Sequence, residues 1–255
     1  MIKADGCTAD LTADSPEEYV VSSFDAIAAG WSPGELLEQI RSSGERLMRS
    51  ASGLTGAEVR GPSRLDGWSR GQVLVHVAGA ADAYVRLLDV ARTGTEAGIE
   101  DSSGPDADLD ASLTRLFARV PALPVPAWQN LVTARAGWRH PAWFTLLRCW
   151  RELETHHVDL DAGYEPADWP AAYVAWALDQ TFATLAERDF PLARAEATDL
   201  GRIWKLTGGG PVVRAPAHVL LGWLAGRTPA PAPPLPDPPI WPLPPAPGWG
   251  RADAA

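Results

Sequence analysis

Cysteine is scarce in this chain, with only Cys7 and Cys149 in 255 residues. Two cysteines cannot build the disulfide framework that stabilises many small secreted domains. The first residues, MIKADGCTADLTADSPEEY, also lack the basic and apolar stretches of a secretory signal. We therefore expect a cytoplasmic protein with reduced thiols.

Long apolar runs and an excess of basic residues are missing too. No segment approaches the roughly 18 consecutive apolar residues of a membrane-spanning helix. The 22 Lys and Arg residues are outnumbered by 32 Asp and Glu residues, which leaves a formal net charge of -10. A chain of this sign is repelled by phosphate backbones and anionic membrane surfaces. The composition excludes nucleic acid and membranes as expected partners, and it leaves the oligomeric state open.

Stretches with helical periodicity dominate the first three quarters of the chain. Apolar residues at steps of three and four predict helices over about 32–54, 69–92, 110–120, 141–163 and 169–188. Ser69 is a suitable N-cap for the second helix, and Gly94 a suitable stop. Four or five helices without clear strands between them predict a mainly α protein built on a four-helix bundle.

The character of the sequence changes after Pro191. The segments IWKL and PVVR predict two short strands joined by a hairpin turn at Gly208–Gly210, and APAHVLLGWLAGR predicts a helix. From Thr228 onward prolines dominate, which predicts an extended segment that packs along the surface or stays mobile, with docking of a partner as the alternative. We expect four parts: a flexible arm (1–30), a helical bundle (31–190), a small α+β domain (191–227) and a proline-rich tail (228–255).

Histidine and glutamate residues on two of the predicted helices suggest a metal site. His76 lies next to apolar residues of the second helix, on or beside its buried face. Glu152 and His156 are four residues apart, so they share one face of the fourth helix. A buried carboxylate needs a partner that neutralises it, and a divalent cation is such a partner. If the two helices are neighbours, these residues form a two-histidine, one-carboxylate set with open coordination positions, as in catalytic zinc sites.

Other arrangements of the same residue types are compatible with the spacing. Glu154 and His157 form a second pair, three residues apart, that faces another side of the helix. Asp159 and His157 can form a local polar pair, or Asp159 can face water. Cys149 lies one turn before Glu152 and is a rival nucleophile, although a cysteine among Leu and Trp residues is more typical of a core.

Three segments carry a resemblance to a known family. LDGWSRGQVLVHVAGAADAYVRLL, RELETHHVDLDAGYEPADWP and AHVLLGWLAGR resemble, in order and spacing, the mycothiol-dependent maleylpyruvate isomerase family of the DinB-like superfamily. The resemblance spans residues 34–227 and implies a DinB-like metal-binding four-helix bundle followed by a small C-terminal α+β domain. It also implies His76, Glu152 and His156 as ligands of a divalent metal, zinc first, and mycothiol as the thiol cosubstrate.

One difference from the family shapes the expected function. Members that isomerise maleylpyruvate have an arginine after the second helix, whereas this chain has no Arg or Lys between Arg92 and Arg115 and carries an acidic loop there. We therefore predict a mycothiol S-transferase that activates the thiolate for attack on, or thiol exchange at, a small neutral or cationic electrophile, in natural-product biosynthesis or detoxification. The alternatives are a maleylpyruvate-type cis-trans isomerase, a metal-dependent hydrolase and a non-catalytic binding protein on the same fold.

Overall fold

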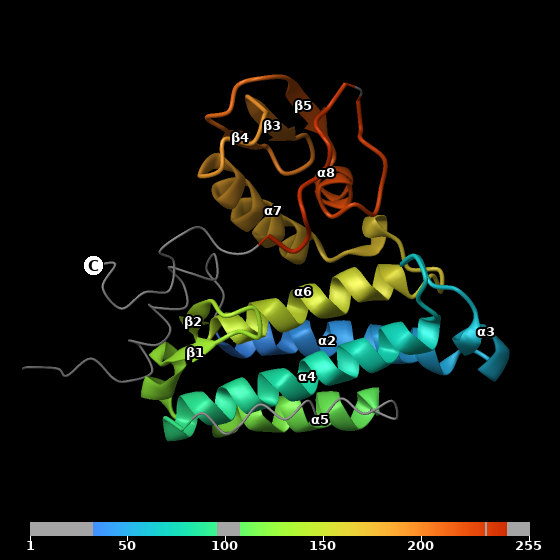
Figure 1. The fold of residues 1–255 in the computed structure, drawn as a ribbon, viewed down its shortest axis with the longest axis vertical. Coiled ribbons are helices and arrows are strands. Elements are labelled where there is room, and N and C mark those ends of the chain that lie inside the picture. Colours follow the sequence, from blue (N-terminus) through green and yellow to red (C-terminus); the bar gives the residue numbers. More distant parts are fainter. Residues whose placement is uncertain (1–32, 96–107, 233, 244–255) are drawn as a thin grey trace, which may run out of the picture.

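The computed structural model describes residues 33–95, 108–232 and 234–243, and four of its helices pack around one apolar core. These are α2 (Pro33–Ser52), α4 (Arg70–Thr93), α5 (Leu109–Arg119) and α6 (Phe144–Asp159). Helices α4 and α2 each contact both α5 and α6, so the four helices lie side by side as a bundle (Figure 1). The prediction of a mainly α fold is confirmed.

Helix α4 begins and ends where its sequence predicts. The backbone N–H of Gln72 donates to Ser69 Oγ at 3.2 Å, and the backbone N–H of Ser69 donates to Gln72 Oε1 at 2.8 Å. This capping box satisfies two backbone donors at the N-terminus. Gly94 ends the helix with φ of 71°, a left-handed conformation that glycine adopts without a Cβ penalty. The helix therefore presents a fixed set of side chains to α6.

Two short strands precede α6, where the sequence predicts the start of the helix at Pro141. Strand β1 (Leu131–Thr133) pairs antiparallel with β2 (Arg139–Pro141), and α6 begins only at Phe144. Strands of three residues are too short for a periodic signal, which is why the pattern missed them. The remaining short helices are α3 (Gly56–Arg60), η1 (Val120–Ala122), η2 (Val125–Gln129) and η3 (Pro166–Asp168).

The C-terminal part consists of α7 (Ala171–Ala186), a three-stranded sheet and α8 (Ala217–Leu224), gathered on the α6 side of the bundle (Figure 1). Strand β3 (Arg194–Ala197) lies between β4 (Arg202–Lys205) and β5 (Val212–Ala215), antiparallel to the former and parallel to the latter. The predicted hairpin across Gly208–Gly210 is therefore wrong. The sequence RAEA lacks the β-branched and aromatic residues that indicate a strand, so the sequence pattern does not predict β3.

Helix α7 contacts α8, β4 and α6, and the boundary expected at residue 190 stays a prediction. Within the proline-rich segment, Trp241 lies against α6, with its ring centre 5.5 Å from the Arg151 guanidinium. The arm (1–30) and the last residues of the tail (244–255) lie outside the described residues. No helix in the described ranges has both the length and the hydropathy needed to cross a membrane.

His140 on β2 makes the stability of the fold dependent on pH. Its side chain is fully buried, with Nδ1 2.8 Å from the Pro141 carbonyl oxygen and Nε2 3.0 Å from Arg148 Nη1. Burial and the adjacent Arg148 charge outweigh the Pro141 carbonyl and lower the pKa of His140 to about 4. In the unfolded chain the pKa of a histidine is about 6.5. Between pH 4 and pH 6.5 the unfolded state therefore binds more protons than the folded state. The stability of the fold consequently falls as the pH falls through this range.

We predict that His140→Gln, which cannot take up the proton, loses less stability on acidification than the native chain. The difference in unfolding free energy between the two proteins should shrink by up to roughly 3 kcal/mol from pH 7 to pH 4. Urea denaturation at four pH values across this range measures it. A difference that stays constant would show that His140 does not titrate in this window.

Candidate metal centre

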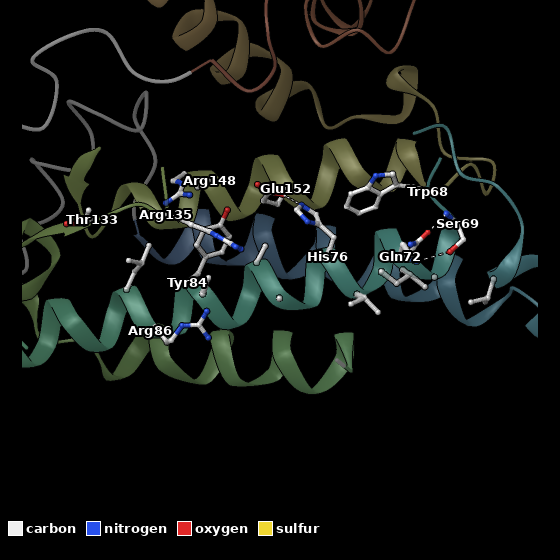
Figure 2. Close-up of a pocket in the computed structure, with 18 of the residues that line it drawn as sticks. Trp68, Ser69, Gln72, His76, Tyr84, Arg86, Thr133, Arg135, Arg148 and Glu152 are labelled. Carbon is white, nitrogen blue, oxygen red and sulfur yellow. Dashed lines mark hydrogen bonds and ion pairs between the residues drawn. The ribbon is translucent and has the colours of Figure 1, made fainter. Parts of the chain in front are cut away.

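A cleft of about 1090 Å³ runs along the face of α4 that points toward α6 and β1. Its walls are mostly apolar, and His76 and Glu152 lie near its middle (Figure 2). Trp68 stands at one end of the cleft, and Thr133 at the other. A concave apolar site with a few convergent polar groups is the usual form of a small-molecule binding site.

The contact between α4 and α6 brings together the three residues singled out in the sequence. One ligand atom each from His76, Glu152 and His156 lies within 4.8 Å of the others. Glu152 Oε2 is 3.1 Å from His156 Nε2 and 3.5 Å from His76 Nε2. The two imidazole rings meet nearly edge to face, with centres 4.7 Å apart and an angle of 77°.

The three side chains are not equally buried. His76 is 42% exposed and borders the cleft, whereas Glu152 is 23% and His156 15% exposed. Burial disfavours the charged forms, but the imidazoles of His156 and His76 outweigh it and hold the pKa of Glu152 well below its usual range. Burial likewise opposes the charge on His156, and Asp159 and Glu152 overcome it, raising the pKa of His156 to about 9. Positive charge is thus favoured beside the Glu152 carboxylate.

A second carboxylate orients His156. Asp159 Oδ2 lies 2.9 Å from His156 Nδ1, and the Arg227 guanidinium donates to both Asp159 oxygens, at 2.7 and 3.0 Å. Asp159 is only 1% exposed. Because Nδ1 is held by this carboxylate, Nε2 is the nitrogen that faces Glu152, 3.1 Å from its Oε2, and metal-bound histidines usually have the same arrangement.

The donor set fits a divalent metal. Oε2 of Glu152 is buried and makes no hydrogen bond of good geometry among the described residues, although two imidazole nitrogens lie near it. Two nitrogen donors and one carboxylate oxygen suit zinc and related divalent ions, and three protein ligands leave a position open for a reactant. The assignment of His76, Glu152 and His156 as metal ligands stays a prediction that this geometry supports.

The alternative pair has another role in the fold. Glu154 is buried against α2, where Arg46 donates a hydrogen bond to it at 2.6 Å. The hydroxyl of Tyr164, in the loop after α6, donates to Glu154 at 2.6 Å as well. His157 lies 2.7 Å from Ser50 Oγ and stacks on the Tyr164 ring at 3.7 Å. Both residues therefore hold α6 to α2 and the following loop. The predicted pairing of Asp159 with His157 or with water is also wrong, because Asp159 pairs with His156 and Arg227.

The other candidate residues divide between core and cleft. Cys149 is buried, and burial with the Glu152 charge raises the pKa of its thiol well above the usual range, as befits a core residue. The Arg151 guanidinium carbon lies 5.2 Å from the centre of the Trp176 ring. Trp68 is 40% exposed and stands edge-on to His76, with ring centres 5.7 Å apart. The site residue that sequence reasoning missed is Arg227, which carries no local signal because it lies 68 residues from Asp159.

A helical bundle with a two-histidine, one-carboxylate set open to a cleft defines the class: a protein with a candidate catalytic metal site. Residues 40–161 match the family model described as the mycothiol maleylpyruvate isomerase N-terminal domain. This match covers 122 of the 255 residues and supports the resemblance to the mycothiol-dependent maleylpyruvate isomerase family.

Two solved structures have a similar fold: a mycothiol-dependent maleylpyruvate isomerase and a mutant of that enzyme. Each has a TM-score of 0.69 and 23% sequence identity, over 79% of this chain and 92% of the other. At this identity the likeness speaks for the fold alone, and it extends beyond the bundle into the C-terminal part. A comparison with curated proteins finds no significant match.

We predict that His156→Ala abolishes zinc binding with little loss of fold, because it removes one of three donors from a partly exposed site. Zinc content after dialysis should fall from about one per chain to near zero, while circular dichroism stays unchanged. His218→Ala, on α8 outside the cleft, is the matched control and should keep its zinc. Unfolding of His156→Ala with unchanged zinc occupancy would refute the assignment.

Asp159→Asn tests the positioning of His156. The amide keeps the shape of the carboxylate but removes its charge, so the imidazole loses its charged hydrogen-bond partner. Zinc affinity should fall by about 10- to 100-fold, measured by competition with a chromogenic chelator. Asp161→Asn, at a partly exposed carboxylate that pairs with Arg64 and Arg70, should bind zinc like the native chain. Equal affinities of the two variants would contradict a role for Asp159.

Proposed function

We propose that this chain is a metal-dependent enzyme that uses mycothiol as its thiol cosubstrate, with His76, Glu152 and His156 as the ligands of a divalent metal. The observation that carries the proposal is that ligand atoms of these three side chains lie within 4.8 Å of one another, with His76 and Glu152 in the wall of one cleft. The match of residues 40–161 to the mycothiol maleylpyruvate isomerase N-terminal domain supports mycothiol as the thiol. When bound, a divalent metal stabilises the thiolate form of a neighbouring thiol, which is the nucleophilic form.

The residues around the ligands have defined tasks in this proposal. Asp159 and Arg227 hold the His156 ring, so its Nε2 keeps one direction. The apolar walls contributed by α4 exclude water and restrict the orientation of reactants, which lowers the entropic cost of bringing them together. Trp68 forms one end of the cleft, beside His76.

The lining of the cleft favours isomerisation of a small unsaturated acid over transfer to a neutral or cationic electrophile. The S-transferase prediction rested on the acidic loop after the second helix, and residues 96–107 of that loop lie outside the described residues. The cleft itself is lined by Arg86, Arg135 and Arg148. Guanidinium groups attract carboxylates, so the argument against an acidic substrate loses its force. We place the cis-trans isomerase first and the S-transferase second.

The test is native mass spectrometry combined with product analysis. We predict one metal per chain, a mycothiol adduct, and loss of both in His156→Ala. With maleylpyruvate as the probe, an isomerase forms a product of unchanged mass and consumes no thiol. Stoichiometric consumption of the thiol and a sulfur-bearing product would favour the S-transferase instead.

Two further outcomes would overturn the proposal. Metal-dependent turnover without any thiol would point to a hydrolase on the same fold. A chain that binds neither metal nor mycothiol would be a binding protein. His218→Ala serves again as the control, since it alters a histidine of α8 and leaves the cleft intact.

A further inference from the structure

One end of the cleft carries an arginine that the proposed metal chemistry does not use. Arg148 precedes Glu152 by one turn of α6, so both side chains lie on the same face of the helix. Figure 2 shows Arg148 and Arg135 beside Tyr84, on the side of Glu152 and His76 that lies away from Trp68. The cleft is therefore polar in two places, separated by about 6 Å along the α6 axis.

Arg148 is held in place by neutral groups. Its Nη1 lies 3.0 Å from His140 Nε2, and its guanidinium carbon lies 5.1 Å from the centre of the Tyr84 ring and 5.0 Å from that of Trp138. Because Nδ1 of His140 faces the Pro141 carbonyl oxygen, its Nε2 accepts a hydrogen bond from Arg148. These contacts fix the plane of the guanidinium without neutralising its charge.

The charge on Arg148 has no anionic partner among the described residues. No Asp or Glu side chain in the described ranges forms an ion pair with it, although the side chain is partly buried. A partly buried charge without a counter-ion is costly. Of the five N–H donors of the guanidinium, one is used by His140, which leaves several for a ligand in the cleft.

Tyr84 adds a hydroxyl next to this guanidinium. Its side chain is buried and lines the cleft, and its hydroxyl makes no hydrogen bond with another described residue. Burial raises the pKa of Tyr84 well above its usual range, so the hydroxyl keeps its proton. It is therefore a hydrogen-bond donor in the wall of the cleft.

We propose that Arg148 and Tyr84 form an anion-binding subsite that takes a carboxylate of the small substrate, one helical turn from the candidate metal centre. The planar fork of a guanidinium matches the two oxygens of a carboxylate. The short separation from Glu152 suits a short-chain acid whose carboxylate lies a few bonds from the reacting carbon. The inference deepens the proposed function, because it names the residues that select the acid in a chain that lacks basic residues between Arg92 and Arg115.

Calorimetric titration of the zinc-loaded full chain with maleate, a small planar dicarboxylate, tests the subsite. Arg148→Gln should weaken maleate binding at least about tenfold, and Tyr84→Phe about three- to tenfold, because each loses hydrogen bonds to a charged group. Arg148→Lys, which keeps the charge but loses the fork, should fall between Arg148→Gln and the native chain. Arg92→Gln, an exposed arginine of α4 that pairs with Asp89 outside the cleft, should bind like the native chain.

One further ligand and one double variant define the chemistry. Dimethyl maleate, which lacks the charge, should bind at least about tenfold more weakly than maleate. His76→Ala/His156→Ala should still bind maleate within about threefold of the native chain, because the anion is held by Arg148. Zinc content and mycothiol adducts of the Arg148 and Tyr84 variants should equal those of the native chain.

Several results would overturn the subsite. Native-like maleate affinity in folded, zinc-loaded Arg148→Gln would do so, and so would binding of dimethyl maleate as tight as that of maleate. Loss of maleate binding in the double histidine variant would show that the acid sits on the metal instead. If Arg148→Gln does not fold, the maleate affinity of Tyr84→Phe tests the subsite instead. A failed subsite leaves zinc and mycothiol binding intact, whereas a failed proposed function removes these and leaves maleate binding.

Discussion

The buried carboxylate of Asp159 is the interaction on which the candidate site depends. It accepts hydrogen bonds from His156 at the end of α6 and from Arg227 after α8, so one side chain joins the bundle to the C-terminal part. A carboxylate that is 1% exposed is stable only when its charge is compensated. Arg227 compensates it by donating hydrogen bonds to both oxygens of Asp159. The position of His156 is therefore tied to the packing of a segment far away in the chain.

The three acidic side chains of helix α6 differ in their partners. Glu152 points to the cleft, Glu154 is bound by Arg46 of α2, and Asp159 meets Arg227. The two carboxylates with arginine partners are neutralised within the fold. Among the described residues, Glu152 forms ion pairs only with the imidazoles of His76 and His156. An imidazole can give up a proton and bind a metal ion in its place. The difference in partners, and not the residue type, distinguishes the candidate ligand from structural acids on the same helix.

Local patterns in the sequence were enough for the bundle and for the candidate ligands. The caps of α4 and the four-residue spacing of Glu152 and His156 depend on neighbours within one or two turns. The sheet and the outer layer of the site depend on distant partners: β3 pairs in parallel with β5, and Arg227 reaches Asp159 across 68 residues. Glu154 and His157, three residues apart, also share one side of the helix, and only their contacts with α2 show that they have a different role from the candidate ligands.

The whole chain carries a net negative charge, whereas several arginines line its cleft. A net charge of -10 argues against long-range attraction of any anion. At physiological ionic strength, however, charges more than about 8 Å apart are largely screened in solvent. A small acid inside the cleft is therefore governed by its nearest neighbours, and Arg148 is one of these. The net charge bears on a partner such as nucleic acid because such a ligand covers a large surface. It does not decide the charge of a substrate that touches a few side chains.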